Sequence, residues 1–178
     1  MMAGLQMQAV VQGYLTYDLT SSPLRLGLVN TGFAFPMLAL SLFGGAIADR
    51  VEKKRIIQMA QALGSATAVA IGIAVTTGTV SWVHLLISSV VNGIIFAFLV
   101  PARTALIPKL IDRSLVSNAL AINAAAMSGT TIIAPAIGGS LYSVIGPAGV
   151  YYAIAAVELC AVVLTGLIRT KDEPAPST

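Results

Sequence analysis

The chain has 178 residues, of which 57% are hydrophobic and only 10% are charged, and its mean hydropathy is +0.89. Soluble domains carry about 25% charged residues, so this chain has too little charge to cover a surface that faces water. The basic residues outnumber the acidic ones but lie in separate short segments, which argues against a nucleic-acid partner. The only cysteine, Cys160, and the only histidine, His84, exclude an intramolecular disulfide and the usual zinc ligand sets. We expect a lipid bilayer as the solvent, and neither a metal nor a cofactor.

Apolar segments long enough to cross a bilayer follow one another along the chain. A spanning helix needs about 20 mostly apolar residues. A first segment, 1–17, is short and contains three glutamines, so we expect an incomplete first helix. A polar connection is predicted over 102–117. The other predicted spans are 24–48, 56–77, 82–100, 119–145 and 150–168.

These segments predict an all-α polytopic membrane protein with about six transmembrane helices. The helix bundle covers residues 1–168, and residues 169–178 form a tail. Basic residues mark the cytoplasmic side of membrane proteins, and nine of the ten fall on one predicted side, where the tail also lies. Arg25 stands alone on the other side. The nine are Arg50, Lys53, Lys54, Arg55, Arg103, Lys109, Arg113, Arg169 and Lys171.

This orientation gives a direct prediction. Single cysteines placed at Val51, Ser114 and Ser177, in a chain whose Cys160 has been replaced, should resist impermeant thiol reagents in intact cells. All three should react once the cells are permeabilised, which serves as the control. Labelling of any one of them in intact cells would require a different number of spans.

Small residues recur every fourth position on the third segment, at Ala60, Gly64, Ala68 and Gly72. Such a stripe lets helix backbones approach closely. We interpret it as a packing surface in preference to a substrate path.

The most specific local pattern is the charged connection that follows the second segment. It contains Gly45, Asp49, Arg50, Lys53 and Lys54, and the basic residues by themselves would fit a topology signal. The spacing resembles the signature of the major facilitator superfamily in the same loop, although a glutamate replaces the signature's second glycine. The resemblance implies that Asp49 pairs at the cytoplasmic surface, with Arg103 as one candidate partner.

A second resemblance lies on the fifth segment. Pro135, Gly138 and Gly139 match the core of the superfamily's antiporter motif, in which Ala134 replaces the first glycine. The stretches at 17–29 and 101–123 are similar to the enterobactin-exporter-like branch. Ser89 stands where proton-coupled members of the superfamily carry an arginine on the fourth helix, which argues against proton coupling at that position.

The resemblance covers nearly the whole chain and implies a fold. Carriers of the superfamily have twelve helices in two halves, each built from two three-helix inverted repeats, with the substrate bound between the halves. The chain is similar to the first half only, from the middle of its first helix. The resemblance therefore implies a multi-pass protein of the cell membrane that acts with a missing C-terminal half or with a second copy.

Polar residues inside the predicted spans are candidate substrate contacts, because such groups are costly in lipid. Gln8 and Gln12 are one helical turn apart, and Asn92 and Asn123 lie on the fourth and fifth segments. Interhelical hydrogen bonding is an equally good explanation for these amides. Glu158 is the only acidic residue in the middle of a span, and we expect it to be neutral, in either a structural or a cavity-facing role.

These observations bear on three possible functions. The first is the export of small amphipathic or siderophore-like molecules by a carrier of which this chain is a half or a fragment. The second is a membrane-embedded enzyme, which would need a nucleophile and a base, or metal ligands, within reach of each other; the sequence offers no such constellation, so we expect no enzyme. The third is a non-transporting scaffold or regulatory subunit formed by a solitary half.

Overall fold

The computed structural model describes residues 2–50, 52–110 and 112–167, except for the side chains of 42–50, 109, 110 and 113. Every regular element in these ranges is helical. The five α-helices and one short 3-10 helix are α1 (Met2–Thr20), α2 (Pro23–Arg50), α3 (Lys53–Thr76), α4 (Trp82–Leu110), η1 (Arg113–Leu115) and α5 (Val116–Leu167).

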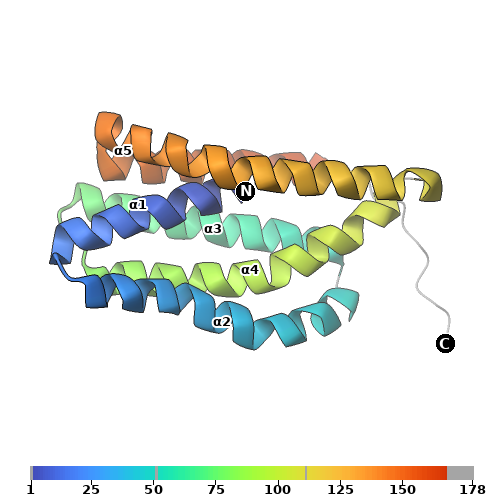
Figure 1. Ribbon diagram of the computed structural model, residues 1–178, viewed down its shortest axis with the longest axis horizontal. Coiled ribbons are helices and arrows are strands. Elements are labelled where there is room, and N and C mark those ends of the chain that lie inside the picture. Colours follow the sequence, from blue (N-terminus) through green and yellow to red (C-terminus); the bar gives the residue numbers. More distant parts are fainter. Residues whose placement is uncertain (1, 51, 111, 168–178) are drawn as a thin grey trace.

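The helices lie side by side along the long axis of a bundle (Figure 1). The most extensive contacts join α2 to α4, and α5 to both α3 and α1, while α3 also packs on α4. Because α2 contacts almost nothing but α4 and α1, several of its described apolar side chains remain exposed, including Leu24, Phe35 and Leu38. Exposed apolar surface on this scale suits a lipid environment.

The longest helix, α5, consists of two helical segments that meet at Gly146. This residue has a positive φ of 70° and is non-helical, a conformation that glycine adopts without steric cost. Both segments lie against α1, because Gly138 meets Met7 while Ile154 meets Gly4. The chain therefore turns back at Gly146, inside the predicted connection between the fifth and sixth segments.

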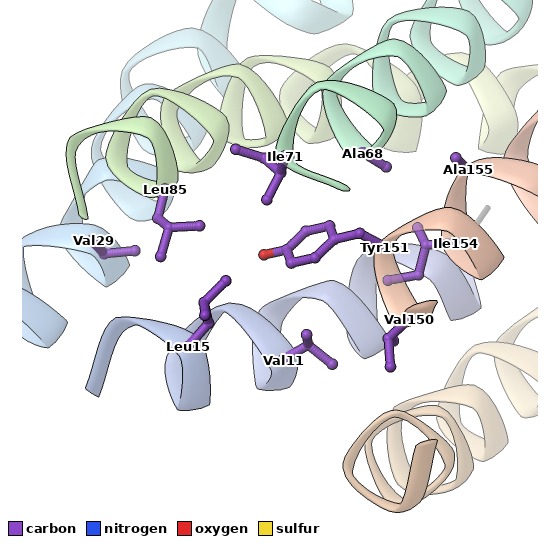
Figure 2. Close-up of a cluster of buried hydrophobic side chains, with 10 residues drawn as sticks. All are labelled: Val11, Leu15, Val29, Ala68, Ile71, Leu85, Val150, Tyr151, Ile154 and Ala155. Carbon is purple, nitrogen blue, oxygen red and sulfur yellow. The ribbon is translucent and has the colours of Figure 1, made fainter. Parts of the chain in front are cut away.

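The main hydrophobic core joins all five α-helices, with Val29 as the member from α2. Tyr151 and Ile154 of α5 are fully or almost fully buried against Val11 of α1, Leu85 of α4 and Ile71 of α3. Figure 2 shows the Tyr151 ring reaching from α5 into this cluster. The core therefore fixes the second segment of α5 between α1 and α3.

Four helices are long and apolar enough to cross a membrane, within α2, α3, α4 and α5. The expectation of an all-α polytopic membrane protein is thus confirmed. Over the described residues, α1 is not one of these candidates, which agrees with the expectation that the first helix is incomplete. The 52 residues of α5 cover the fifth predicted segment and residues 150–167 of the sixth.

The predicted polar connection over 102–117 is wrong in its first half. The α4 helix continues through Pro101 and Pro108 to Leu110. A proline inside a helix removes a backbone hydrogen bond, but Ala102 and Leu106 are buried in a second core cluster with Ile57 of α3. Burial of these side chains offsets the lost hydrogen bonds, and the sequence pattern alone gives no measure of that burial.

Candidate functional site

Two glutamines on one face of α1 are hydrogen-bonded to α4 in the interior of the bundle. The Gln8 amide Nε2 donates to Ser88 Oγ at 3.0 Å. The Gln12 Nε2 donates to Ser89 Oγ at 2.6 Å and to the Leu85 carbonyl at 2.8 Å. Both glutamines are buried, so the one-turn spacing seen in the sequence places both amides on the face that meets α4.

Asn92 completes this amide cluster, which we define as Gln8, Gln12, Ser88, Ser89 and Asn92. The Asn92 Nδ2 donates to the Ser88 carbonyl at 2.9 Å. The amide oxygens of Gln8 and Asn92 are buried without a hydrogen-bond partner among the described residues. A buried acceptor without a donor is costly, so these oxygens are a natural place for an additional donor.

The amide cluster borders a cavity of about 230 Å³ between α1, α2 and α4. It is lined by four members of the amide cluster, Gln8, Gln12, Ser89 and Asn92. The rest of its wall consists of Leu5, Gln6 and Ala9 of α1, Asn30 and Phe33 of α2, and Phe96 of α4. The two phenylalanine rings meet edge to face, with centroids 5.7 Å apart. The cavity thus combines uncharged amides with an aromatic wall, a composition typical of small-molecule sites.

Two further cavities continue from this one along α1. A cavity of about 160 Å³ shares Leu5, Gln6 and Phe96 with the first. It shares Met2 and Thr130 with a third cavity of about 700 Å³. We call these three cavities together the α1 groove. Asn123 and Arg103, both predicted as site residues, line the largest cavity.

Glu158 lies apart from the other candidates. It is fully buried where α5 meets α1 and α3, with its carboxyl against Gly4 and Gly64. Neither carboxyl oxygen has a hydrogen-bond partner among the described residues, and Glu158 lines none of the three cavities of the α1 groove. Its surroundings therefore favour a packing role over substrate contact.

The predicted loop motif is only partly covered by the structure. The backbones of Gly45, Asp49 and Arg50 lie near the end of α2, while their side chains fall outside the described residues. Lys53 and Lys54 begin α3. The Lys54 Nζ donates to the Gly166 carbonyl of α5 at 3.0 Å, so this lysine ties the start of α3 to the end of α5.

The antiporter-like motif lies on the first segment of α5. That segment remains helical through Pro135, and the non-helical backbone is at Gly146. A Cβ added to Gly138 would lie 3.2 Å from the Met7 Cα, whereas one added to Gly139 would meet open space. Gly138 therefore permits close approach of α5 to α1, and Gly139 does not take part in this contact.

Comparison with known proteins agrees with this architecture. A protein-family model described as "transmembrane secretion effector" matches residues 2–178, nearly the entire chain. The chain belongs to this family of the major facilitator superfamily. Two curated relatives are also of transporter type. The MFS-type transporter YfiS of Bacillus subtilis is 27% identical over 154 residues, and the staphyloferrin A transporter of Staphylococcus aureus is 30% identical over 122 residues.

Family membership supports a non-enzymatic membrane transport protein in general. The matches cover 86% and 67% of this chain, respectively, but only 36% and 30% of the relatives' own lengths. The chain therefore spans about a third of the curated transporters it matches.

Sequence reasoning did not identify some of the residues around the amide cluster. Ser89 was considered only as the substitute for an arginine, yet it accepts the shortest hydrogen bond of Gln12. Asn30 lines the cavity from α2 and was also missed. An isolated amide within an apolar span was the available signal for Asn30, by the same argument that selected Gln8 and Asn92.

Proposed function

We propose that this chain forms a six-helix half of a major facilitator carrier that exports small molecules across the cell membrane. Its helices would form two three-helix repeats, with the two segments of α5 as the fifth and sixth helices. A second half, or a second copy of the chain, would complete the substrate site. The loops rich in Lys and Arg and the tail at 169–178 would face the cytoplasm.

The observation that carries this proposal is the amide cluster beside a cavity in the apolar interior. Polar side chains inside a membrane are costly unless they are paired or functional. Here they are gathered on the facing sides of α1 and α4, around a cavity of about 230 Å³. A carrier needs such uncharged hydrogen-bonding groups near the midplane, where substrate sites of these transporters lie.

The shape of the α1 groove supports loading from the side of the basic loops. Its largest cavity, about 700 Å³, lies at the end marked by Arg103. Toward the other end, α1 and α5 are joined by the Tyr142 hydroxyl, which donates to Asp18 Oδ2 at 2.5 Å, and by the Tyr14–Tyr142 ring contact. If the basic loops face the cytoplasm, as proposed above, a groove that is wide at that end would admit substrates from inside the cell. The family's description as a secretion effector also favours export.

The test uses inside-out membrane vesicles from the native host, supplied with the low-molecular-weight fraction of a cell extract. Mass spectrometry should identify at least one compound that accumulates when the chain is expressed. Combining Gln12→Leu with Asn92→Leu should lower that accumulation about tenfold or more, because each leucine removes a hydrogen-bonding amide worth about 1 kcal/mol.

A matched control is Thr67→Val. Thr67 is half-buried on α3, lines none of the three cavities of the α1 groove, and donates a hydrogen bond within its own helix, to the Leu63 carbonyl. This variant should accumulate the compound as the unmodified chain does, at equal expression. Accumulation that persists in the double variant, or the absence of any accumulating compound, would contradict the proposed function.

A further inference from the structure

The α1 groove changes in character along its length. Amides and hydroxyls line the end at Gln8 and Asn92. The middle combines four apolar side chains with three polar ones, Gln6, Thr130 and Thr131. At the far end Arg103 is the only charged residue among those that line the groove in the described part of the chain. The groove therefore offers one fixed positive charge and no described negative charge.

The depth of Arg103 follows from the length of α4. Trp82 begins α4, and the Arg25 guanidinium lies 5.6 Å from the centroid of its ring, as expected for a tryptophan at a membrane interface. Arg103 is 21 residues further along, which corresponds to about 32 Å of helix. The hydrocarbon core is about 30 Å thick, so Arg103 lies at the opposite interface, at the wide mouth of the groove.

The Arg103 side chain is half-buried and forms no ion pair among the described side chains, where the one salt bridge joins Arg55 to Glu52. The side chain of Asp49, its candidate partner by the family resemblance, lies outside that set. The same cavity is also lined by the apolar residues Leu99, Leu106 and Ile122 and by the amides of Asn123 and Gln61. A guanidinium in a partly apolar wall forms strong charge-assisted hydrogen bonds with carboxylates and similar anions. Such a site selects an anionic group attached to an apolar body.

We infer that the α1 groove binds amphipathic organic anions, with Arg103 holding the acid group at the mouth and the amide cluster receiving an uncharged polar end. This inference rests on the proposed function and names the substrate class of the same site. A phospholipid phosphate offers similar chemistry to Arg103, so the experiment must separate a dissolved organic anion from a lipid headgroup.

The test measures equilibrium binding of three dansyl probes of equal length to the full chain in phosphatidylcholine nanodiscs. The probes end in a carboxylate, a hydroxyl or an ammonium group, and empty discs supply the background. The carboxylate probe should bind about tenfold more tightly than the other two. Arg103→Gln should remove this preference, and Arg103→Lys should retain part of it, because lysine keeps the charge without the planar fork.

Arg55→Gln is the matched control, because Arg55 carries the same charge at the start of α3, is exposed and lines none of the three cavities. It should leave the preference unchanged. The retention volume of each variant in gel filtration shows that the chain is folded. Equal binding of the three probes, no binding of any, or an unchanged preference in Arg103→Gln would overturn the inference.

A second arm repeats the measurement in nanodiscs that contain phosphatidylglycerol, and identifies lipids that remain bound after purification. The carboxylate preference should persist there. The inference would be overturned in favour of a headgroup site if the unmodified chain retains an anionic lipid that Arg103→Gln loses and that displaces the carboxylate probe. Binding can be measured without transport. Failure of the vesicle assay alone would therefore reject the proposed function, while the preference for the carboxylate probe could still be measured in nanodiscs.

Discussion

Replacing Gly93 with alanine is expected to cause one of the largest losses of stability of any single methyl addition to this chain. Gly93 is buried on α4, and a Cβ at this position would overlap the carbonyl oxygen of Phe33 on α2. The carbonyl carbon and Cα of Phe33 would lie only 3.1 and 3.2 Å away. These are backbone atoms, so no side-chain rotation can make room, and α2 must move away from α4.

We expect Gly93→Ala to lower the free energy of unfolding by about 3 kcal/mol, the upper end of the usual range for overpacking. The measurement is unfolding of the purified chain in mixed micelles with increasing sodium dodecyl sulfate, followed by circular dichroism. Gly27→Ala is the matched control. Gly27 lies on α2, the helix that also carries Phe33, and a Cβ added there would meet open space. A Gly93→Ala chain as stable as the Gly27→Ala chain would mean that α2 and α4 do not pack as described.

The contact between Gly64 and Glu158 should give the second large effect. A Cβ added to Gly64 would overlap the Glu158 Oε2 and lie 3.2 Å from its Cδ. The carboxyl has little space to move into, because Glu158 is fully buried and Gly4 of α1 lies on its other side. We expect Gly64→Ala to destabilise the chain by about 2 kcal/mol through this overlap.

A second substitution separates the steric effect from the charge. Adding Glu158→Ala to Gly64→Ala removes the obstructing carboxyl and should restore most of the lost stability. Adding Glu158→Gln keeps the size of the side chain and should restore none. The same unfolding measurement applies, with Gly139→Ala as the control at an open position. Rescue by glutamine but not by alanine would show that the charge of Glu158, and not its volume, dominates this contact.

Glu158→Gln alone should change stability little. Both oxygens of this side chain lack a hydrogen-bond partner among the described residues, so replacing the carboxyl with an amide of the same size breaks no described hydrogen bond. In the vesicle assay this variant should also accumulate the compound normally, since Glu158 lies outside the α1 groove. Loss of transport at normal expression would assign Glu158 a role beyond packing.

The helices were largely predictable from the sequence, because a run of about 20 apolar residues is a strong and local signal. The stripe at Gly64 and Gly72 was likewise predicted as a packing surface, and α5 does meet it through Glu158 and Tyr152. The continuation of α4 past Pro101 was not predictable. It depends on burial of Ala102 and Leu106 against other helices, and a local pattern does not contain that information.

The candidate site was predictable in part. Helical spacing showed that Gln8 and Gln12 share a face, but it could not show that this face meets Ser88 and Ser89. Glu158 was a candidate because it is the only acidic residue in the middle of a predicted span, and the sequence left its role open between structure and cavity; the fold places its carboxyl against two glycines. Periodicity identifies a face of a helix, and only the tertiary contacts identify its neighbour.

The turn at Gly146 joins two segments of α5 that contribute unequally to the groove and the core. The segment before it contributes Asn123 and Thr130 to the wall of the groove, and the segment after it contributes Thr165. Tyr151 and Ile154 bury the second segment in the core, while Leu141 and Tyr142 of the first segment pack against the edge of that core. The segment with the most deeply buried side chains is therefore connected to the longer stretch of groove wall through one non-helical residue. Because glycine tolerates a wider range of backbone angles than any other residue, Gly146 is the position in α5 where a change of angle between the two segments costs least.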